Sequence, residues 1–405
     1  MIQISDVRPP RKPRLMTRSK RWMTPDALKV TADRLDDLAS PFASLFGRTE
    51  ARAHAQTYLR GLLVGPPHKS VVLIAQLLGQ GRVSGLQKFL NHAPWQYGEI
   101  QKAIQETFVR MVSDEGSEAI GVIRPSGFTK KGNESVGVER QINPRTGRRE
   151  NCQIGIFLIA IGGRRSALLD HRLHLPPSWC DDTLLASRRR RKVHIPDGLE
   201  YLSLAEIASK MVRDVAARRT LLLDWLTADA TPGTDGSLVR ELEGCGIPYV
   251  LGVSPDARIW SLAHGARGPA ERMNGSPRAV RAAAEIAREL PACYWKRIGS
   301  EGRSAGESID PSVVFAAVRV WRELPTGVPV ESWLLLRRSL TDLRAPLRAD
   351  ISNAPEKTAP GVLARVACAQ DHSAGLIEDA RAHLGLAHYE TRLWRGWHHH
   401  MSLSL

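Results

Sequence analysis

The chain has 405 residues but only five cysteines, and it has no apolar run long enough to cross a membrane. The cysteines are odd in number and show no spacing that suits zinc: Cys152, Cys180, Cys245, Cys293 and Cys368. This pattern argues against a disulfide framework and predicts reduced thiols in a cytoplasmic protein. The longest apolar run, Ile154–Ile161, falls far short of the roughly 20 residues of a transmembrane helix. No apolar signal-peptide core follows the basic N-terminus, so we expect no membrane partner.

Acidic residues are also in short supply. The sequence has 57 lysines and arginines against 42 aspartates and glutamates, which gives a net charge of +15. Such an excess favours contact with polyanions, nucleic acid first. Hydrophobic residues make up 42% and charged residues 24%, which is typical of a soluble globular protein. At this length the chain can form two or three domains, or one elaborated domain.

Residues 1–23 form a basic, proline-containing segment that we expect to be a disordered arm. Seven lysines and arginines lie between Arg8 and Arg21, together with three prolines, and such a composition does not fold alone. Thr24 and Pro25 then provide a helix start, with an N-cap hydroxyl followed by a proline at the first helical position. From there apolar residues recur at helical spacing, which predicts a helical N-terminal domain over residues 24–117.

After residue 117 the pattern changes from helices to strands. Extended segments are expected at Ala119–Ile123, Glu134–Gln141, Asn151–Ile161 and Ser166–Leu175. A polar loop containing Arg188–Lys192 follows. Helices and strands then alternate, at Leu204–Arg218, Leu221–Leu226, Gly236–Glu243 and Tyr249–Val253. Three antiparallel strands followed by helix, strand, helix and strand is the RNase H-like order, so we predict an α/β fold with an RNase H-like mixed sheet, its first part spanning residues 118–254.

A mixed segment, residues 255–358, interrupts this order and predicts an α+β insertion before the last helix. Its expected elements are one helix and three strands, at Arg278–Leu290, Tyr294–Ile298, Val313–Glu323 and Ser332–Arg338. Residues 359–405 then supply the last helix of the RNase H-like core and a tail. The tail contains the run His398-His399-His400, which looks like an affinity tag but which we interpret as native sequence.

The stretch Arg124–Gly155 resembles the DDE transposases of bacterial insertion sequences. In that family the text is roughly Asp-Glu-Thr-Gly-Phe-x-Lys-Lys-Gly, then Ser-Val-Gly-Val-x-Arg-Gln, then Glu-Asn-Cys-Gln-x-Gly. The matching positions here are Gly127, Phe128, Lys130 to Gly132, Ser135 to Val138, Arg140, Gln141 and Glu150 to Gln153. Later matches extend the resemblance over nearly the whole chain, at Leu175–Asp182, Gly246–Leu251, Arg337–Leu340 and Gly385–Trp394.

The resemblance implies a site in which three acidic residues hold two Mg²⁺ ions, about 3.5–4 Å apart. At the first position, however, the family's Asp-Glu-Thr has become Arg124-Pro125-Ser126. The second acid is retained as Asp229. The third falls at Ala374-Gly375, with Asp371 and Glu378 one helical turn to either side. Whether either of these replaces the third acid stays open at this point.

Arginine at the first position is expected to abolish the metal site. A guanidinium is always charged and only donates hydrogen bonds, so it cannot ligate Mg²⁺. Close to Asp229 it would pair with the carboxylate and repel a divalent cation. We therefore predict an ion pair between Arg124 and Asp229, no metal and no other cofactor. The chain should not be an active DDE transposase or nuclease.

Three hypotheses about function follow. The leading one is a transposase-derived protein with a DNA-binding or regulatory role. Its candidates for binding anions or nucleic acid are Lys131, Arg140, Arg148, Arg149, Arg188, Arg189, Arg190, Arg191 and Lys192. The second is an enzyme repurposed to a small anionic substrate in the former cleft, with acid, base and anchor candidates Arg124, Lys130, Asp229, His388, Tyr389 and Glu390. The third is a decayed transposase without function. The sequence leaves the DNA site, the substrate and the oligomeric state open.

Overall fold

The computed structural model describes residues 25–64, 68–79, 83–218, 223–230, 236–261, 280–297, 312–327, 329–342 and 344–404. The predicted basic arm, residues 1–23, lies outside these ranges. The chain divides into two units, Met1–Pro41 and Phe42–Leu405. In the first unit the structure describes helix α1 (Pro25–Ala39) and the start of the 3-10 helix η1 (Ser40–Phe46).

Helices precede the first strand, as the apolar spacing predicts. In the second unit they are α2 (Thr49–Val64), α3 (Val71–Leu77), α4 (Val83–His92) and α5 (Tyr97–Ser113). Helix α3 begins where the Ser70 hydroxyl accepts a hydrogen bond from the backbone N–H of Leu73, at 3.3 Å. Tyr58, Ile74 and Leu86 form the buried centre of this helical layer. The boundaries of the proposed domains stay predictions.

The strands form one mixed sheet, whose first six members are β1 (Ala119–Thr129), β2 (Glu139–Ile142), β3 (Arg149–Gly162), β4 (Arg165–His174), β5 (Trp225–Ala228) and β6 (Tyr249–Val253). Strand β3 pairs antiparallel with both β1 and β4, whereas β5 is parallel to β1 and β6 is parallel to β5. The resulting order β4-β3-β1-β5-β6 is RNase H-like, which confirms the predicted fold class.

The described part of the insertion extends this same sheet. Strand β11 (Arg348–Ser352) pairs antiparallel with β6, and beyond it lie β10 (Pro329–Ser339), β9 (Val313–Glu323), β7 (Arg258–Ser261) and β8 (Val280–Ala282). The predicted strand Val313–Glu323 is thus confirmed. The strand predicted at Tyr294–Ile298 is reduced, in its described part, to an isolated antiparallel β-bridge between Lys296 and Phe315. The preceding residues form a 3-10 turn, η2 (Ala292–Tyr294), in which Tyr294 N donates to Pro291 O at 3.0 Å.

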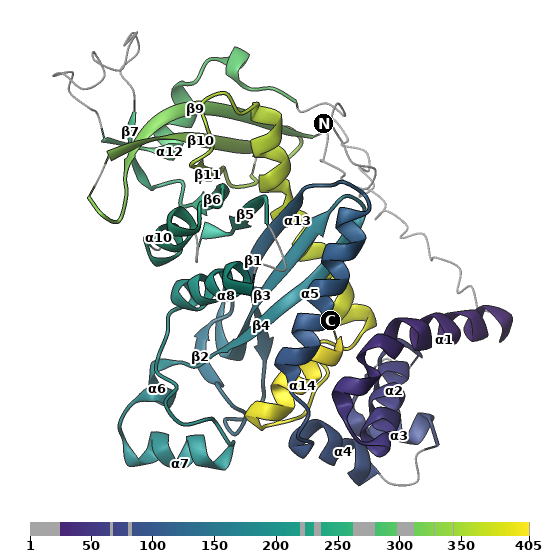
Figure 1. The fold of residues 1–405 in the computed structure, drawn as a ribbon. Helices are drawn as coiled ribbons and strands as arrows, with labels where there is room; N and C mark the ends of the chain where they lie inside the picture. Colours follow the sequence, from purple (N-terminus) through teal and green to yellow (C-terminus); the bar gives the residue numbers. More distant parts are fainter. Residues whose placement is uncertain are drawn as a thin grey trace, which may run out of the picture. The chain divides into compact units, whose positions relative to one another are not determined.

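Helices cover both faces of the central strands. Helix α13 (Pro360–His383) packs on one face, where Ile120 and Val122 of β1 meet it. Helices α8 (Leu204–Arg218) and α10 (Gly236–Cys245) pack on the other face, where Ile123 is buried. Figure 1 shows α13 passing behind β1 and β3 while α5 lies in front of β4. Because side chains alternate along a strand, Arg124 is on the α13 face with Ile120 and Val122.

Two further sequence-based element predictions need correction. The expected polar loop around Arg188–Lys192 is helical: α6 (Pro177–Cys180) is followed by α7 (Leu184–Lys192). The Thr183 hydroxyl caps α7 by accepting from Ala186 N, and leucine, alanine and arginine favour helix. The strand expected at Glu134–Gln141 is reduced to β2, because Gly137 has a φ of 68° and belongs to a turn.

The last described element, α14 (Trp394–Ser404), is buried between the helical layer and β4. His398, His399 and His400 are each at most 2% exposed. The His400 Nδ1 lies 2.7 Å from the hydroxyl of Tyr58, and the His399 ring stacks on Trp95 with centroids 3.6 Å apart. These histidines are therefore core residues of the fold. None of the described helices is both long enough and apolar enough to cross a lipid bilayer.

Candidate functional site

The parallel register of β1 and β5 brings the first two positions of the expected site together. Ile123 pairs with Ala228, so the next residues, Arg124 and Asp229, come side by side. Arg124 Nη1 lies 3.0 Å from Asp229 Oδ2. The Arg124 side chain is 15% exposed and that of Asp229 is 38% exposed, so the pair lies at the edge of the core. The ion pair predicted from the sequence is confirmed.

The other nitrogens of Arg124 bind helix α13. Its Nε donates to Ser373 Oγ at 2.7 Å, and its Nη2 donates to the backbone carbonyl of Gln370. All three guanidinium nitrogens therefore have an acceptor. The arginine fastens α13 to the central strands at the place where the resemblance puts the first metal-binding acid.

A second arginine, Arg337 on β10, extends the network and was not among the predicted site residues. Its Nε lies 3.2 Å from Asp350 Oδ2 in an ion pair that is not aligned as a hydrogen bond, and its Nη1 lies 3.2 Å from Asp371 Oδ2. The Arg337 side chain is 5% exposed and that of Asp350 is 1% exposed. Gln370 links the two arginines, since its carbonyl accepts from Arg124 and its side-chain Nε2 lies 3.3 Å from Asp350 Oδ1.

The two acids that flank the expected third position both bind arginine. Asp371 meets Arg337 on one oxygen and Arg348 on the other, at 3.2 and 2.6 Å. Glu378 binds Arg145 at 2.9 Å, and this contact holds the pKa of Glu378 below its usual value. At the expected third position itself stand Ala374 and Gly375, which carry no ligand atom. The question of whether Asp371 or Glu378 replaces the third acid stays open, as it does in the sequence.

Charge is thus balanced across this cleft. Asp229, Asp350 and Asp371 each lie within 3.2 Å of a guanidinium nitrogen. A carboxylate that already binds an arginine must break that ion pair before it can ligate a cation. Chemically the arrangement is suited to holding strands and helix together, because oppositely charged groups at this distance in a partly buried site attract one another strongly.

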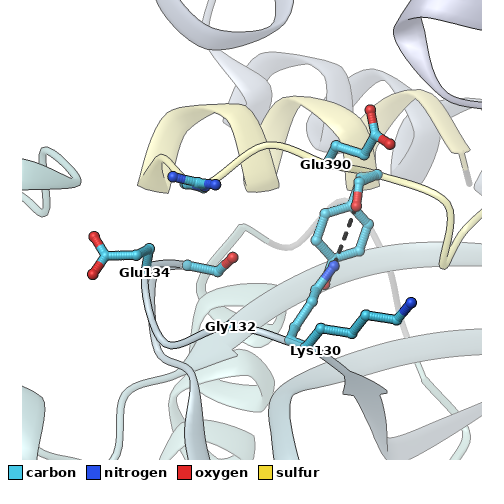
Figure 2. Close-up of a pocket in the computed structure, with 8 residues that line it drawn as sticks. Lys130, Gly132, Glu134 and Glu390 are labelled. Carbon is cyan, nitrogen blue, oxygen red and sulfur yellow. Dashed lines mark hydrogen bonds between the residues drawn. The ribbon is translucent and has the colours of Figure 1, made fainter.

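The candidates of the small-substrate hypothesis do not converge on Arg124. Lys130 lies one residue beyond the end of β1, and six residues of extended strand correspond to roughly 20 Å. Tyr389 and Glu390 lie beside Lys130, with Lys131, Glu134 and Arg392, around a pocket of about 240 Å³ (Figure 2). The expectation of one shared cleft is therefore wrong, because the direction of β1 carries Lys130 away from Asp229.

Lys130 has an unusual environment for a lysine. Its Nζ lies 3.4 Å from the centre of the Tyr389 ring and donates to the Tyr389 carbonyl at 3.2 Å. Burial lowers the pKa of Lys130 to about 7, an effect that Glu390 opposes and Arg381 reinforces. Near neutral pH this amine therefore exists as both the charged and the neutral form.

Tyr389 and His388 have mainly structural contacts. The Tyr389 hydroxyl donates to Gln153 Oε1 at 2.8 Å, and burial raises the pKa of Tyr389. His388 Nδ1 accepts from the backbone N–H of Lys69 at 3.1 Å and its ring stacks on His68. Burial, followed by the charges of His68 and Lys69, lowers the pKa of His388. These contacts hold the segment after α13 against β3 and against the residues before α3, and the catalytic role of His388 and Tyr389 stays a prediction.

The predicted basic residues lie in two groups. Lys131, Arg140, Arg148 and Arg149 are exposed at the ends of β1, β2 and β3. The second group is α7, where Arg189 stacks on Trp179 with 4.0 Å between its guanidinium carbon and the ring centre, and Lys192 pairs with Glu134. Arg188 and Arg191 on the same helix are exposed and have no ion pair within the described part of the chain.

Residues 41–301 match the family model described as DDE superfamily endonuclease. This range includes Arg124, Asp229 and Lys130, but it ends before Arg337 and Gln370. No curated protein matches the chain.

Proposed function

Since the chain belongs to the DDE superfamily endonuclease family, we propose that it is a transposase-derived DNA-binding protein without two-metal strand cleavage. The observation that carries the proposal is Arg124, which stands where the resemblance places the first acid and pairs with Asp229 at 3.0 Å. In a two-metal mechanism the ions hold both the attacking and the leaving oxygen. A permanent positive charge at this position opposes the binding of either ion.

Binding to DNA is supported by family membership and by charge. The net charge is +15, and Arg188 and Arg191 of α7 are exposed. Lysines and arginines that neutralise phosphates release condensed counterions, so affinity falls steeply with salt. A regulatory role would follow from binding without cleavage, because a protein that occupies a DNA site without cutting it can block or recruit others.

A cleavage assay tests the lost chemistry. Supercoiled plasmid DNA incubated with the protein and Mg²⁺ or Mn²⁺ should stay intact across a metal titration. Asp229→Ala is the matched control, because it removes the one retained acid. Nicking that depends on Mn²⁺ and disappears in Asp229→Ala would overturn the proposal.

A salt titration tests the binding. Contact with about five phosphates gives a slope of log K against log salt of about −4 to −5. Replacing Arg188 and Arg191 with glutamine should make the slope shallower by up to about 2, since each lost phosphate contact removes about 0.9. The control is Lys102→Gln with Lys210→Gln, which removes the same charge from exposed positions on α5 and α8. Binding that is absent at low salt, or indifferent to salt, favours the small-anion enzyme instead.

A further inference from the structure

The loop that follows β1 and the segment that follows α13 together form a pocket with an excess of hydrogen-bond donors. Lys130, Lys131, Ser135 and Arg392 line it, and Tyr389 supplies one wall (Figure 2). Its volume of about 240 Å³ is below the roughly 300–1,000 Å³ that holds drug-sized ligands. The pocket is therefore suited to one compact polar group.

Among the residues that the structure describes, the cationic side chains of this pocket form no ion pair. Within the described residues, no carboxylate lies within 4.0 Å of Lys130, Lys131 or Arg392. Two acids do line the pocket, but Figure 2 shows the carboxylates of Glu134 and Glu390 pointing away from the Lys130 amine. Glu134 is engaged by Lys192 of α7. This contrasts with the Arg124 cleft, where each acid binds a guanidinium.

An unneutralised amine that is largely buried lacks the water that normally solvates its charge. Within the described part of the chain, Lys130 has one hydrogen-bond acceptor, the Tyr389 carbonyl, and its amine lies over the Tyr389 ring, although an ammonium can donate three hydrogen bonds. A bound anion would supply the missing acceptors. With three cationic side chains and the Ser135 hydroxyl around one small space, the best match is a group with more than one negative charge and several acceptor oxygens.

We propose that this pocket is a binding site for a phosphate group, with Lys130 as its central ligand and Lys131, Ser135 and Arg392 as further donors. A phosphate monoester carries a charge of about −1.5 to −2 near neutral pH and three strong acceptor oxygens. The phosphate can come from a terminal phosphate of a nucleic acid or from a small phosphate ester. The site does not depend on the DNA-binding proposal, and binding here leaves the absence of cleavage untouched.

Binding of an anion should also change the protonation of Lys130. The charged groups around the amine are Glu390, which favours its charged form, and Arg381, Lys131 and Arg392, while the neutral Tyr389 ring packs against it. Since its pKa is about 7, an arriving anion should draw a proton onto the amine, up to about half a proton at pH 7. Sulfate is the appropriate probe for this measurement, because it does not itself titrate near neutral pH.

Calorimetry on the full chain tests the site. Sulfate and inorganic phosphate are titrated into the native protein, Lys130→Met, and Lys102→Met as the matched control at an exposed lysine of α5. We expect Lys130→Met to weaken binding by at least tenfold and to abolish proton uptake with sulfate, measured in buffers of different ionisation enthalpy. Equal binding by all three proteins, or sulfate binding without proton uptake by the native protein, overturns the proposal. Ser135→Ala, with a smaller expected loss, decides the case if Lys130→Met does not fold.

The source of the phosphate is decided by a second comparison. Single-stranded oligonucleotides of one sequence are prepared with a 5′-phosphate or a 5′-hydroxyl, and inorganic phosphate is used as competitor. A nucleic-acid end is the ligand if the phosphorylated strand binds more tightly and loses that advantage in Lys130→Met. A small phosphate ester is the ligand if inorganic phosphate binding depends on Lys130 while both strands bind equally. If neither depends on Lys130, the pocket is not a phosphate site.

Discussion

Arg124 lies on β1 and Lys130 lies six residues later, just beyond its end. The partners of their two positive charges differ. Every guanidinium nitrogen of Arg124 has an acceptor, one of them the carboxylate of Asp229. Lys130 has a backbone carbonyl and an aromatic ring, but no carboxylate within 4.0 Å in the described structure. The first charge joins elements of the fold, whereas the second is left available for a ligand. Positive charge alone, therefore, does not distinguish a structural residue from a binding residue; its partners do.

Lowering the pH should produce the largest difference in stability between the Lys130 region and the Arg124 region. Tyr389, in the wall of the Lys130 pocket, packs against His400 of α14, and burial lowers the pKa values of His400 and His171 to about 3 and that of His399 to about 4. Burial also lowers the pKa of His398 well below its usual value. A lowered pKa means that the unfolded chain binds more protons, so stability is complete above about pH 6.5 and is lost as pH falls towards 4. Each histidine contributes about 1.4 kcal/mol per pH unit in this window.

Hydrogen exchange at pH 7 and pH 5 measures this difference. Protection should fall first in α14 and around Lys130, while β1 and α13 keep theirs, because no histidine takes part in the contacts described for Arg124 and Arg337. A uniform loss of protection along the chain would show that the two regions do not respond separately to acid.

Removing Arg337 should have the next largest effect. Arg337→Met leaves Asp350 buried without its guanidinium, and breaking such a pair from one side costs about 3–5 kcal/mol in the free energy of unfolding. The double change Arg337→Met with Asp350→Leu removes both charges and should recover much of the loss. Urea unfolding of the two variants gives the comparison. A single variant as stable as the native protein would mean that the ion pair between Arg337 and Asp350 does not stabilise the fold.

An acid in place of Arg124 should destabilise less and should change the response to metal. Arg124→Asp sets two carboxylates side by side in a partly exposed site, and we expect a loss of about 1–3 kcal/mol. Mn²⁺ should then stabilise this variant, by about 1.4 kcal/mol at ten times its Kd. Arg124→Met is the matched control, since it removes the guanidinium but adds no ligand. Thermal unfolding with and without Mn²⁺ checks this, and an equal response of both variants would count against an inherited metal position at Asp229.

Replacing Lys130 should have the smallest effect on stability, and its sign should be the opposite. Because burial lowers the Lys130 pKa from 10.5 to about 7, the unfavourable charged form predominates in the folded protein at pH 6 and below. The resulting destabilisation decreases as pH rises from 7 towards 10.5. Lys130→Met should therefore be about as stable as the native protein or up to about 1 kcal/mol more stable at pH 6, with a smaller gain at pH 9. Urea titrations at the two pH values test this, and a clear loss of stability at pH 6 would assign Lys130 a structural role like that of Arg124.

The sequence predicts the central fold and the Arg124–Asp229 pair for one reason. Both depend on local patterns, the alternation of strands and helices and the position of each residue after its strand, which the parallel register of β1 and β5 then brings together. The role of Arg337 could not be predicted in this way, because its partners Asp350 and Asp371 come from separate elements that meet only when the insertion joins the sheet. Asp350, placed between the apolar residues Ala349 and Ile351, was one available signal.

The same limitation explains the error about a single cleft. Lys130, Tyr389 and Glu390, three candidates of the small-substrate hypothesis, lie around one pocket. Their distance from Asp229 depends on the length of β1, which continues to Thr129 through the proline at position 125. The run of three histidines is likewise ambiguous in sequence. Its core role becomes visible only through contacts with Tyr58 and Trp95, far away in the chain.

Helix α14 has a consequence for how the protein is made. Leu403 belongs to the hydrophobic core of the helical layer, and the contact between Tyr58 and His400 spans 342 residues. At about 5–20 residues per second, a ribosome needs on the order of tens of seconds to synthesise that stretch. During this time α2 and α4 have emerged while the helix that completes their core is still missing. The helical layer therefore exposes apolar surface until α14 has been synthesised. We expect a chaperone to bind this surface during that time.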